Sequence, residues 1–155
     1  PVRQWFIGFS LLSALVLNLI PGSHMPAVPD WVALTLAFWC VREPLRVGMT
    51  SGFVLGVAMD VANAAVMGQH ALAYSVGVFL VQYFRRRLAM FTLAQQALQI
   101  FPLLLLVEVV ALMAGWMSTR TPHGGWVFAS AFSGTLLWWA VAAAGKMPAA
   151  KPGQE

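Results

Sequence analysis

Two acidic side chains, Asp60 and Glu108, stand inside long apolar stretches and are the strongest candidates for chemistry in this sequence. Two carboxylates that share a buried site can act as an acid–base dyad. Asp60, however, follows the letters GVAM, which hold only the first glycine of the Gly-x-Gly-Asp pattern of intramembrane aspartyl proteases. The letters after it, VANAAVM, provide neither a nucleophile nor a base. We therefore predict that the chain is not an enzyme.

Other residues that could carry chemistry are few and widely spaced. His24, His70 and His123 fall in predicted loops and are too far apart in the sequence to suggest a set of metal ligands. Cys40 is the sole cysteine, which excludes an intrachain disulfide and a cysteine-based metal cluster. No phosphate-binding loop occurs in the sequence. We expect neither a cofactor nor a metal.

The composition indicates that lipid surrounds most of the chain. Of its 155 residues 60% are hydrophobic and 9% are charged, whereas a soluble domain carries about 25% charged residues. The net charge of +4 comes from basic residues scattered between apolar runs, so nucleic-acid binding is not expected. The chain begins at Pro1 without a methionine, and we expect that a few residues precede it.

Six apolar runs predict a single transmembrane domain over residues 1–155. They cover residues 5–20, 28–41, 47–67, 71–84, 93–117 and 126–145. The second and fourth runs are short, because a straight crossing takes about 20 apolar residues, but the distribution of charge favours six crossings. With six, only Arg120 lies on the far side, and the remaining basic residues share the side that the positive-inside rule makes cytoplasmic: Arg3, Arg42, Arg46, Arg85, Arg86, Arg87, Lys146 and Lys151. We predict an all-α, six-helix transmembrane bundle with both termini, including the tail 146–155, in the cytoplasm.

The third run carries small residues and Asp60 at a spacing of four. Such a spacing keeps near neighbours on one slowly rotating helix face. Small side chains on that face let a second helix backbone approach closely, which drives helix association in lipid. We expect this helix to be central and packed against at least one partner. The residues of the stripe are Gly48, Gly52, Gly56, Asp60, Ala64 and Gly68.

Asp60 lies on the packed face of this helix, near its outer end, and three interpretations of it are open. It could cap the following turn, through Asn63 or through backbone N–H groups of NAAVMGQH. It could hold a partner chain or a ligand, or it could be catalytic. We prefer the first interpretation. On that basis we expect Asp60→Asn to keep the hydrogen bonding and Asp60→Leu to lose assembly.

Glu108 is the more costly acid, since it lies near the middle of the fifth run. Its neighbours at helical spacing offer no polar partner, so it must face the bundle interior and pair with another segment, or stay protonated. Asp60 is one candidate neighbour, and Arg42 and Arg46 are two others. A structural interhelical hydrogen bond and a binding role are equally compatible with the sequence. A different role is expected for Arg85, Arg86 and Arg87, which should face anionic lipid headgroups.

Several of these features resemble the bacterial rod shape-determining MreD family. The resemblance rests on Pro29-Asp30-Trp31 at the opening of the second run, the Gly52…Gly56…Asp60 stripe, and the restart at Gly68 and Ala71. The later stretches QQALQIFPLLLLVEVV, with its acid at Glu108, and GTLLWW are similar to that family as well.

This resemblance implies a non-enzymatic scaffold of the rod-shape machinery in the bacterial inner membrane. It implies binding to the membrane helix of MreC and an indirect connection to MreB and the peptidoglycan synthases, with a homodimer as an open alternative. The family is grouped with the six-helix substrate-binding subunits of energy-coupling factor transporters, which suggests a similar fold. It also supplies a rival function, the capture of a vitamin-like ligand. The residues expected to bind a partner or organise the bundle are Gly52, Gly56, Asp60, Asn63 and Glu108.

Overall fold

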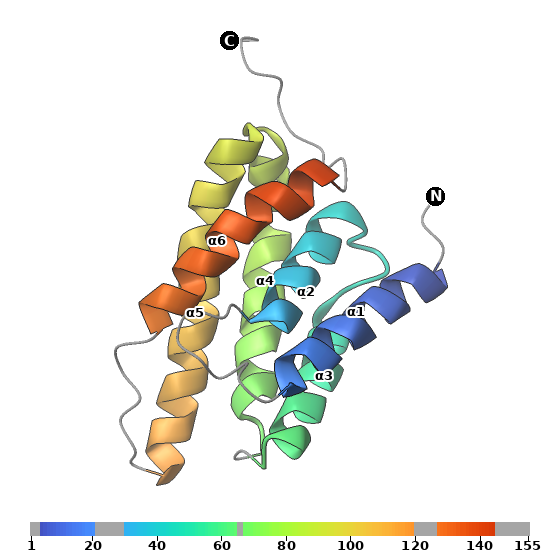
Figure 1. The fold of residues 1–155 in the computed structure, drawn as a ribbon. Helices are drawn as coiled ribbons and strands as arrows, with labels where there is room; N and C mark the ends of the chain where they lie inside the picture. Colours follow the sequence, from blue (N-terminus) through green and yellow to red (C-terminus); the bar gives the residue numbers. More distant parts are fainter. Residues whose placement is uncertain (1–3, 21–29, 65–66, 120–126, 145–155) are drawn as a thin grey trace.

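The computed structural model describes residues 4–20, 30–64, 67–119 and 127–144, and these parts form six helices (Figure 1). The prediction of an all-α chain with six helices is therefore confirmed for the described residues. Arg3, Arg120, His24, His123 and the tail 146–155 lie outside them. The helices are α1 (Gln4–Leu19), α2 (Trp31–Arg42), α3 (Met49–Ala62), α4 (Gln69–Ala89), α5 (Leu93–Thr119) and α6 (Val127–Ala144).

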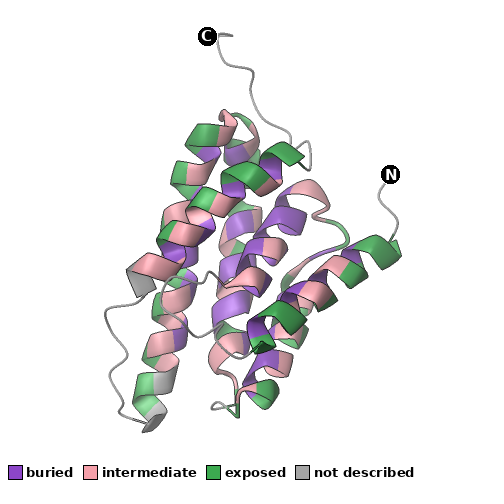
Figure 2. Cartoon of the chain, viewed as in Figure 1, coloured by how far each residue is buried: buried purple, intermediate pink, exposed green. Residues whose placement is uncertain are grey.

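Helix α2 is the centre of the bundle. It contacts α1, α4, α5 and α6, and all but three of its twelve residues are buried. Figure 2 shows this burial along nearly its whole length. Helices α3 and α4 form the most extensively packed pair, and α5 packs against both α4 and α6. The bundle is thus built around a short helix that is surrounded by protein on most sides.

The third and fourth helices differ in extent from the apolar runs that predicted them. Helix α3 ends at Ala62, where the run continues to residue 67, and the chain turns through Ala64 and Gly68, whose φ angles are 49° and 100°. Helix α4 continues to Ala89, where the run stops at residue 84. Its last turns therefore carry the three arginines, which apolarity alone did not assign to the helix.

Apolar length distinguishes α5 from the other described helices. Residues Leu93–Ala114 of α5 are long and apolar enough to cross a membrane, with a mean hydropathy of 2.3. The other apolar helices are shorter, between 10 and 17 residues: Gln4–Leu19, Trp31–Arg42, Met49–Ala62 and Ala129–Ala144. At 1.5 Å per residue, α2 is about 18 Å long, well short of a hydrocarbon core of about 30 Å.

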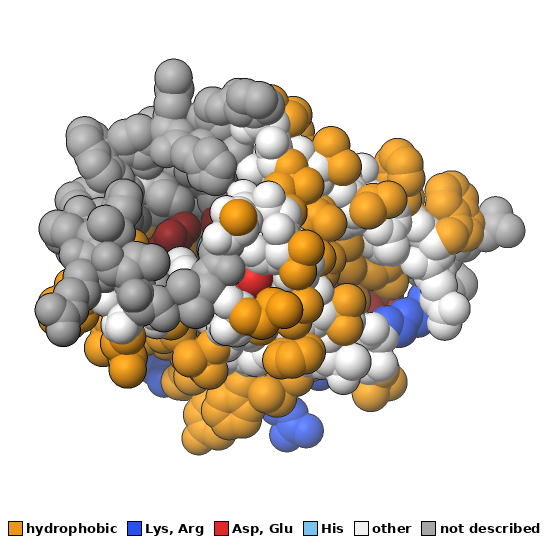
Figure 3. Space-filling model, turned by 90° about the horizontal axis from the view of Figure 1, so that it is seen from below, with side chains coloured by type: hydrophobic (Ala, Val, Ile, Leu, Met, Phe, Trp, Pro, Cys, Tyr) orange, Lys and Arg blue, Asp and Glu red, His pale blue; other side chains and the backbone are white. Residues whose placement is uncertain are grey.

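The two ends of the bundle carry opposite charge. At the end where α2 and α4 finish lie all the described lysine and arginine residues, namely Arg42, Arg46, Arg85, Arg86 and Arg87. We call this the arginine end. The opposite end, where α2 and α4 begin, holds Asp30 and Asp60, and we call it the aspartate end. Seen from that end, an acidic side chain shows near the centre of the face, while lysine and arginine show only at the margins (Figure 3).

Candidate functional site

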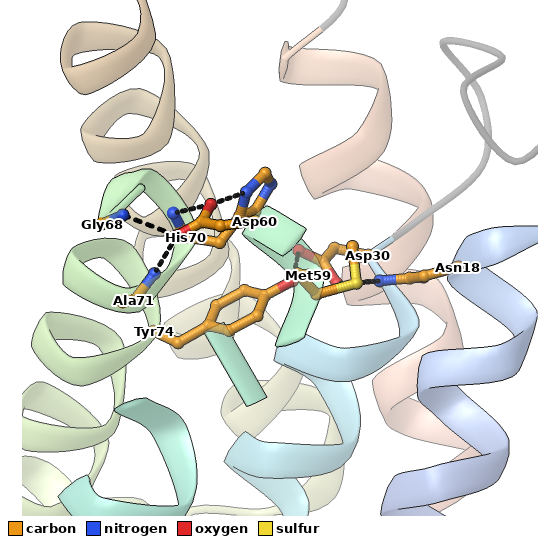
Figure 4. A network of polar contacts seen from close by, with 8 residues as sticks. All are labelled: Asn18, Asp30, Met59, Asp60, Gly68, His70, Ala71 and Tyr74. Atoms are coloured by element: carbon orange, nitrogen blue, oxygen red, sulfur yellow. Dashed lines mark hydrogen bonds and ion pairs between the residues drawn. The ribbon is translucent and has the colours of Figure 1, made fainter. Parts of the chain in front are cut away.

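The carboxylate of Asp60 joins the end of α3 to the start of α4. Its Oδ2 accepts hydrogen bonds from the backbone N–H groups of Gly68 at 2.9 Å and Ala71 at 3.4 Å. Its Oδ1 accepts from the backbone N–H of His70 at 2.9 Å and lies 2.9 Å from His70 Nδ1 (Figure 4). The side chain is 1% exposed. A helix start leaves its first N–H groups without partners, and here an acid of the preceding helix accepts from them.

This geometry matches the capping interpretation through backbone N–H groups. Asn63, the other capping partner considered, instead ends α3, where its backbone N–H donates to Met59 at 3.0 Å. The geometry argues against the expectation that Asp60→Asn keeps the hydrogen bonding, because both carboxylate oxygens of Asp60 accept from N–H donors. An asparagine would turn an amide NH₂ toward one of those donors and could not replace the second acceptor.

The glycine stripe is covered by α4. A Cβ added at Gly56 would stand 2.5 Å from the backbone nitrogen of Ala71 and 2.6 Å from the carbonyl oxygen of His70. A Cβ at Gly52 would stand 2.9 Å from Val78 Cγ2. The helix backbones therefore approach closely because these positions lack side chains. In this chain the stripe serves the contact between α3 and α4, and a partner helix could reach it only by displacing α4.

A second polar centre, which the sequence analysis did not single out, surrounds Asp30. Asp30 is the N-cap of α2: its Oδ1 accepts from the backbone N–H groups of Val32 and Ala33, both at 3.1 Å. The same oxygen accepts from Asn18 Nδ2 at 2.7 Å, and Oδ2 accepts from the hydroxyl of Tyr74 at 2.7 Å. One carboxylate therefore links α1, α2 and α4. Asp30 directly precedes the apolar letters WVALTLAFWC, and an acid in that place is an N-cap signal that the sequence contains.

The two aspartate centres are neighbours at the same end of the bundle. Asn18 Nδ2 also lies 4.0 Å from the sulfur of Met59, the residue before Asp60 (Figure 4). The rings of His70 and Tyr74, one from each centre, have centroids 5.8 Å apart. Together these side chains form a continuous polar network across α1, α2, α3 and α4.

Glu108 pairs with α6 rather than with the neighbours proposed for it. Its Oε1 accepts a hydrogen bond from Ser130 Oγ at 3.1 Å. Asp60 is engaged by α4, and Arg42 and Arg46 lie at the arginine end, so the partner found for Glu108 is none of the three candidates. Glu108 instead borders a small cavity between α2, α5 and α6. The cavity is lined by Asp30, Ala33, Leu104, Glu108, Ser130 and Ala131.

The three consecutive arginines are exposed on the last turns of α4. Arg85 is also fixed to the protein, because its Nε donates to the backbone carbonyl of Val41 at 3.2 Å. Val41 lies in the last turn of α2, where carbonyl groups have no partner within the helix and attract cations. Arg85 thus closes the end of α2 as well as contributing to the charged surface.

The described contacts of these centres join helices to one another. Each described carboxylate at the aspartate end accepts from groups that the fold itself supplies. Among the described residues, no group of three or more His, Cys, Asp and Glu side chains is placed to hold a metal ion. Cys40 is buried, and its Sγ lies 3.6 Å from the carbonyl oxygen of Val47. The geometry serves to lock helices together.

Comparison with known proteins identifies the family. The model of the rod shape-determining protein MreD family matches residues 2–146. The chain belongs to the MreD family. It is 28% identical over 142 residues to the rod shape-determining protein MreD of Haemophilus influenzae, an alignment that covers 88% of this chain and 86% of that protein. No solved structure matches the chain. Membership of MreD, a family of shape-determining membrane proteins, supports a role in rod-shape determination.

Proposed function

We propose that this chain is a non-enzymatic scaffold of the rod-shape machinery that binds the membrane helix of MreC. The observation that carries the proposal is the family match over residues 2–146, nearly the whole chain. The engagement of both aspartates by helix N–H groups supports a scaffold, since it uses these acids to fix helices. Through MreC the chain would organise lateral peptidoglycan synthesis and stand in indirect contact with MreB and the synthases.

The contact with MreC would use the outward faces of the helices. Gly52 and Gly56 are covered by α4, so we assign them to bundle organisation. Large apolar side chains remain exposed on α1, α3 and α6, among them Phe9 at 63%, Val54 at 59% and Leu136 at 61%. A membrane helix packs by van der Waals contact on such ridges.

Site-specific photo-crosslinking tests this proposal. A photoreactive residue at Phe9, Val54 or Leu136, introduced one at a time, should yield a crosslink to MreC from at least one face in native membranes. Exchange of the MreC membrane helix for an unrelated apolar helix should abolish that crosslink, while the extramembrane part of MreC is kept. Crosslinks that survive the exchange would contradict recognition within the membrane.

The rival function is tested by purification of the protein from the same membranes. A substrate-binding subunit of the energy-coupling factor type would co-purify with a vitamin-like small molecule and without MreC. The described cavity between α2, α4 and α5 is lined by apolar residues and by Tyr74. The apolar residues include Ala33, Leu36, Val78, Ile100 and Val107. Such a lining gives little support to capture of a polar ligand. Mass spectrometry of the purified protein distinguishes the two functions.

We also propose that six crossings place both termini in the cytoplasm. The two turns at the arginine end, residues 43–48 and 90–92, would then be cytoplasmic, in agreement with the positive-inside rule. A reporter that is active only in the periplasm should be active when fused after Gly68 and inactive when fused after Glu43 or Arg86. Activity after Arg86 would overturn this orientation.

A further inference from the structure

In the turn between α2 and α3, residues 43–48, two backbone carbonyl groups accept hydrogen bonds from a side chain of α4. Gln82 Nε2 donates to the carbonyls of Pro44 at 3.4 Å and Val47 at 3.2 Å. Arg85 Nε donates to the carbonyl of Val41, in the last turn of α2, at 3.2 Å. Carbonyl groups at an aqueous turn can bond to water, whereas those at membrane depth need protein partners. The turn is therefore equipped for surroundings poor in water.

The position of this turn along α4 gives its depth. Gln82 and Arg85 lie about 20 and 24 Å from the first residue of α4, at 1.5 Å per residue. A hydrocarbon core is about 30 Å thick. If the aspartate end stands at one boundary of that core, the turn stops about 6–10 Å short of the other boundary. Headgroups would then have to reach inward to meet the turn.

The side chains around the turn combine apolar exposure with positive charge. Leu45, at the tip, is 100% exposed and is flanked in sequence by Pro44 and Arg46. On α4, Phe79 stacks on Tyr83, and the exposed rings of Tyr83 and Phe84 precede the three arginines. Aromatic rings followed by arginine are typical of the membrane–water interface. Against five arginines, the sole described acid at this end is Glu43, 3.9 Å from Arg46.

We propose that the arginine end is a binding surface for anionic phospholipids, with Leu45 inserted among their acyl chains. The phosphate groups would bind the guanidinium groups of Arg86, Arg87 and the α2–α3 turn, and Arg85 would orient this surface through Val41. The shortness of α2 and α3 draws the leaflet inward around the turn, since a short hydrophobic element thins the bilayer locally. The proposal concerns lipid contacts of the chain itself and does not depend on MreC.

Competitive lipid binding tests the charged part of the surface. The protein is equilibrated with micelles of equal phosphatidylglycerol and phosphatidylcholine, and the lipids that remain bound are counted by native mass spectrometry. Arg86→Gln and Arg87→Gln should each lower the preference for phosphatidylglycerol about fivefold, the equivalent of about 1 kcal/mol per charge. Arg85 is left unchanged because it also holds Val41. Arg120→Gln, with the same loss of charge in a predicted outward loop, should have no effect.

An unchanged preference in Arg86→Gln and Arg87→Gln would overturn the proposal and indicate that the arginines serve an acidic protein. An equal decrease in Arg120→Gln would also overturn it, because net charge would then explain the result.

The depth of Leu45 is tested separately, by a nitroxide attached to Leu45→Cys in a Cys40→Ala background. In bilayers its relaxation should respond to oxygen, which concentrates in lipid, more than to a water-soluble nickel chelate. Val54→Cys, at an exposed site in the middle of α3, gives the value expected in the acyl region, and Gln154→Cys in the tail gives the reference for predicted aqueous exposure. A nickel response at Leu45 equal to that of the tail would refute insertion of the turn.

Discussion

Replacement of Gly56 by alanine is the sharpest test of how α3 and α4 are joined. The new Cβ would stand 2.5 Å from the nitrogen of Ala71 and 2.6 Å from the carbonyl oxygen of His70, both of them backbone atoms that cannot rotate away. Ordinary contacts of carbon need about 3.5 Å, so the two helices must separate by about 1 Å. Asp60 lies one turn further on the same helix, and its bond to the Ala71 N–H is already 3.4 Å long.

The free energy of this change follows from three contributions. Overpacking costs about 1–3 kcal/mol, and loss of a hydrogen bond to the carboxylate costs about 1.5–3 kcal/mol. Alanine returns about 1 kcal/mol of helix propensity relative to glycine. We expect Gly56→Ala to lower the free energy of unfolding by about 1.5–5 kcal/mol. Titration with SDS in mixed micelles, followed by circular dichroism, measures this as a shift of the unfolding midpoint.

Gly48→Ala, at the N-cap of the same helix, is the control. A Cβ at Gly48 would meet Gln82 Nε2 at 3.6 Å, an ordinary contact, so the free energy of unfolding should fall by no more than the N-cap preference of glycine over alanine, about 1 kcal/mol. Gly52→Ala should fall between the two, because Val78 can yield in part while the carbonyl of Tyr74, at 3.1 Å, cannot. Equal midpoints for Gly56→Ala and Gly48→Ala would refute the assignment of the stripe to the contact with α4.

Three further predictions concern polar side chains inside the bundle and use the same SDS titration. Asp60→Asn should lose about 1–3 kcal/mol, because its amide faces an N–H donor; an unchanged midpoint would show that the second acceptor is dispensable. Tyr74→Phe removes the 2.7 Å bond to a carboxylate and should cost about 1.5 kcal/mol, while Tyr83→Phe, at a ring that is 72% exposed, should cost nothing measurable. In a double-mutant cycle, Glu108→Gln and Ser130→Ala should couple by about 0.6 kcal/mol, and additive effects would exclude the bond between them.

Local patterns in the sequence predicted the helices and the packed face at Gly52 and Gly56. The expectation that α3 is the central helix was wrong, because α2 is the central helix. The spacing of Gly52, Gly56 and Asp60 indicated a face packed against another helix, and the structure shows α4 on that face. The end of α3 was not predictable from apolarity, since residues 63–67 remain apolar apart from Asn63. There the bonds from Asp60 to the N–H groups of the next helix determine where the chain turns.

Hydrogen-bond partners that come from distant segments could not be predicted from the sequence. Asp30 is bonded to Asn18 and Tyr74, which are 12 and 44 residues away, and no local pattern links such positions. Glu108 was expected to face the interior, but its partner, Ser130, depends on how α5 and α6 are rotated against each other. One carboxylate in lipid has many candidate donors, and only the packing of the helices selects among them.

The burial of α2 has a consequence for the order of assembly during synthesis. An apolar segment of twelve residues is too short to be stable alone across a bilayer, and this one is covered by α4 and α6 as well as α1. The start of α6 is about 100 residues after the start of α2. Synthesis at about 5–20 residues per second therefore separates the two helices by about 5–20 s. Throughout that interval α2 has no complete binding site in the membrane. We therefore expect insertion of α2 to be coupled to association of the later helices, so that a truncated chain that ends before α4 leaves its central helix without a stable place.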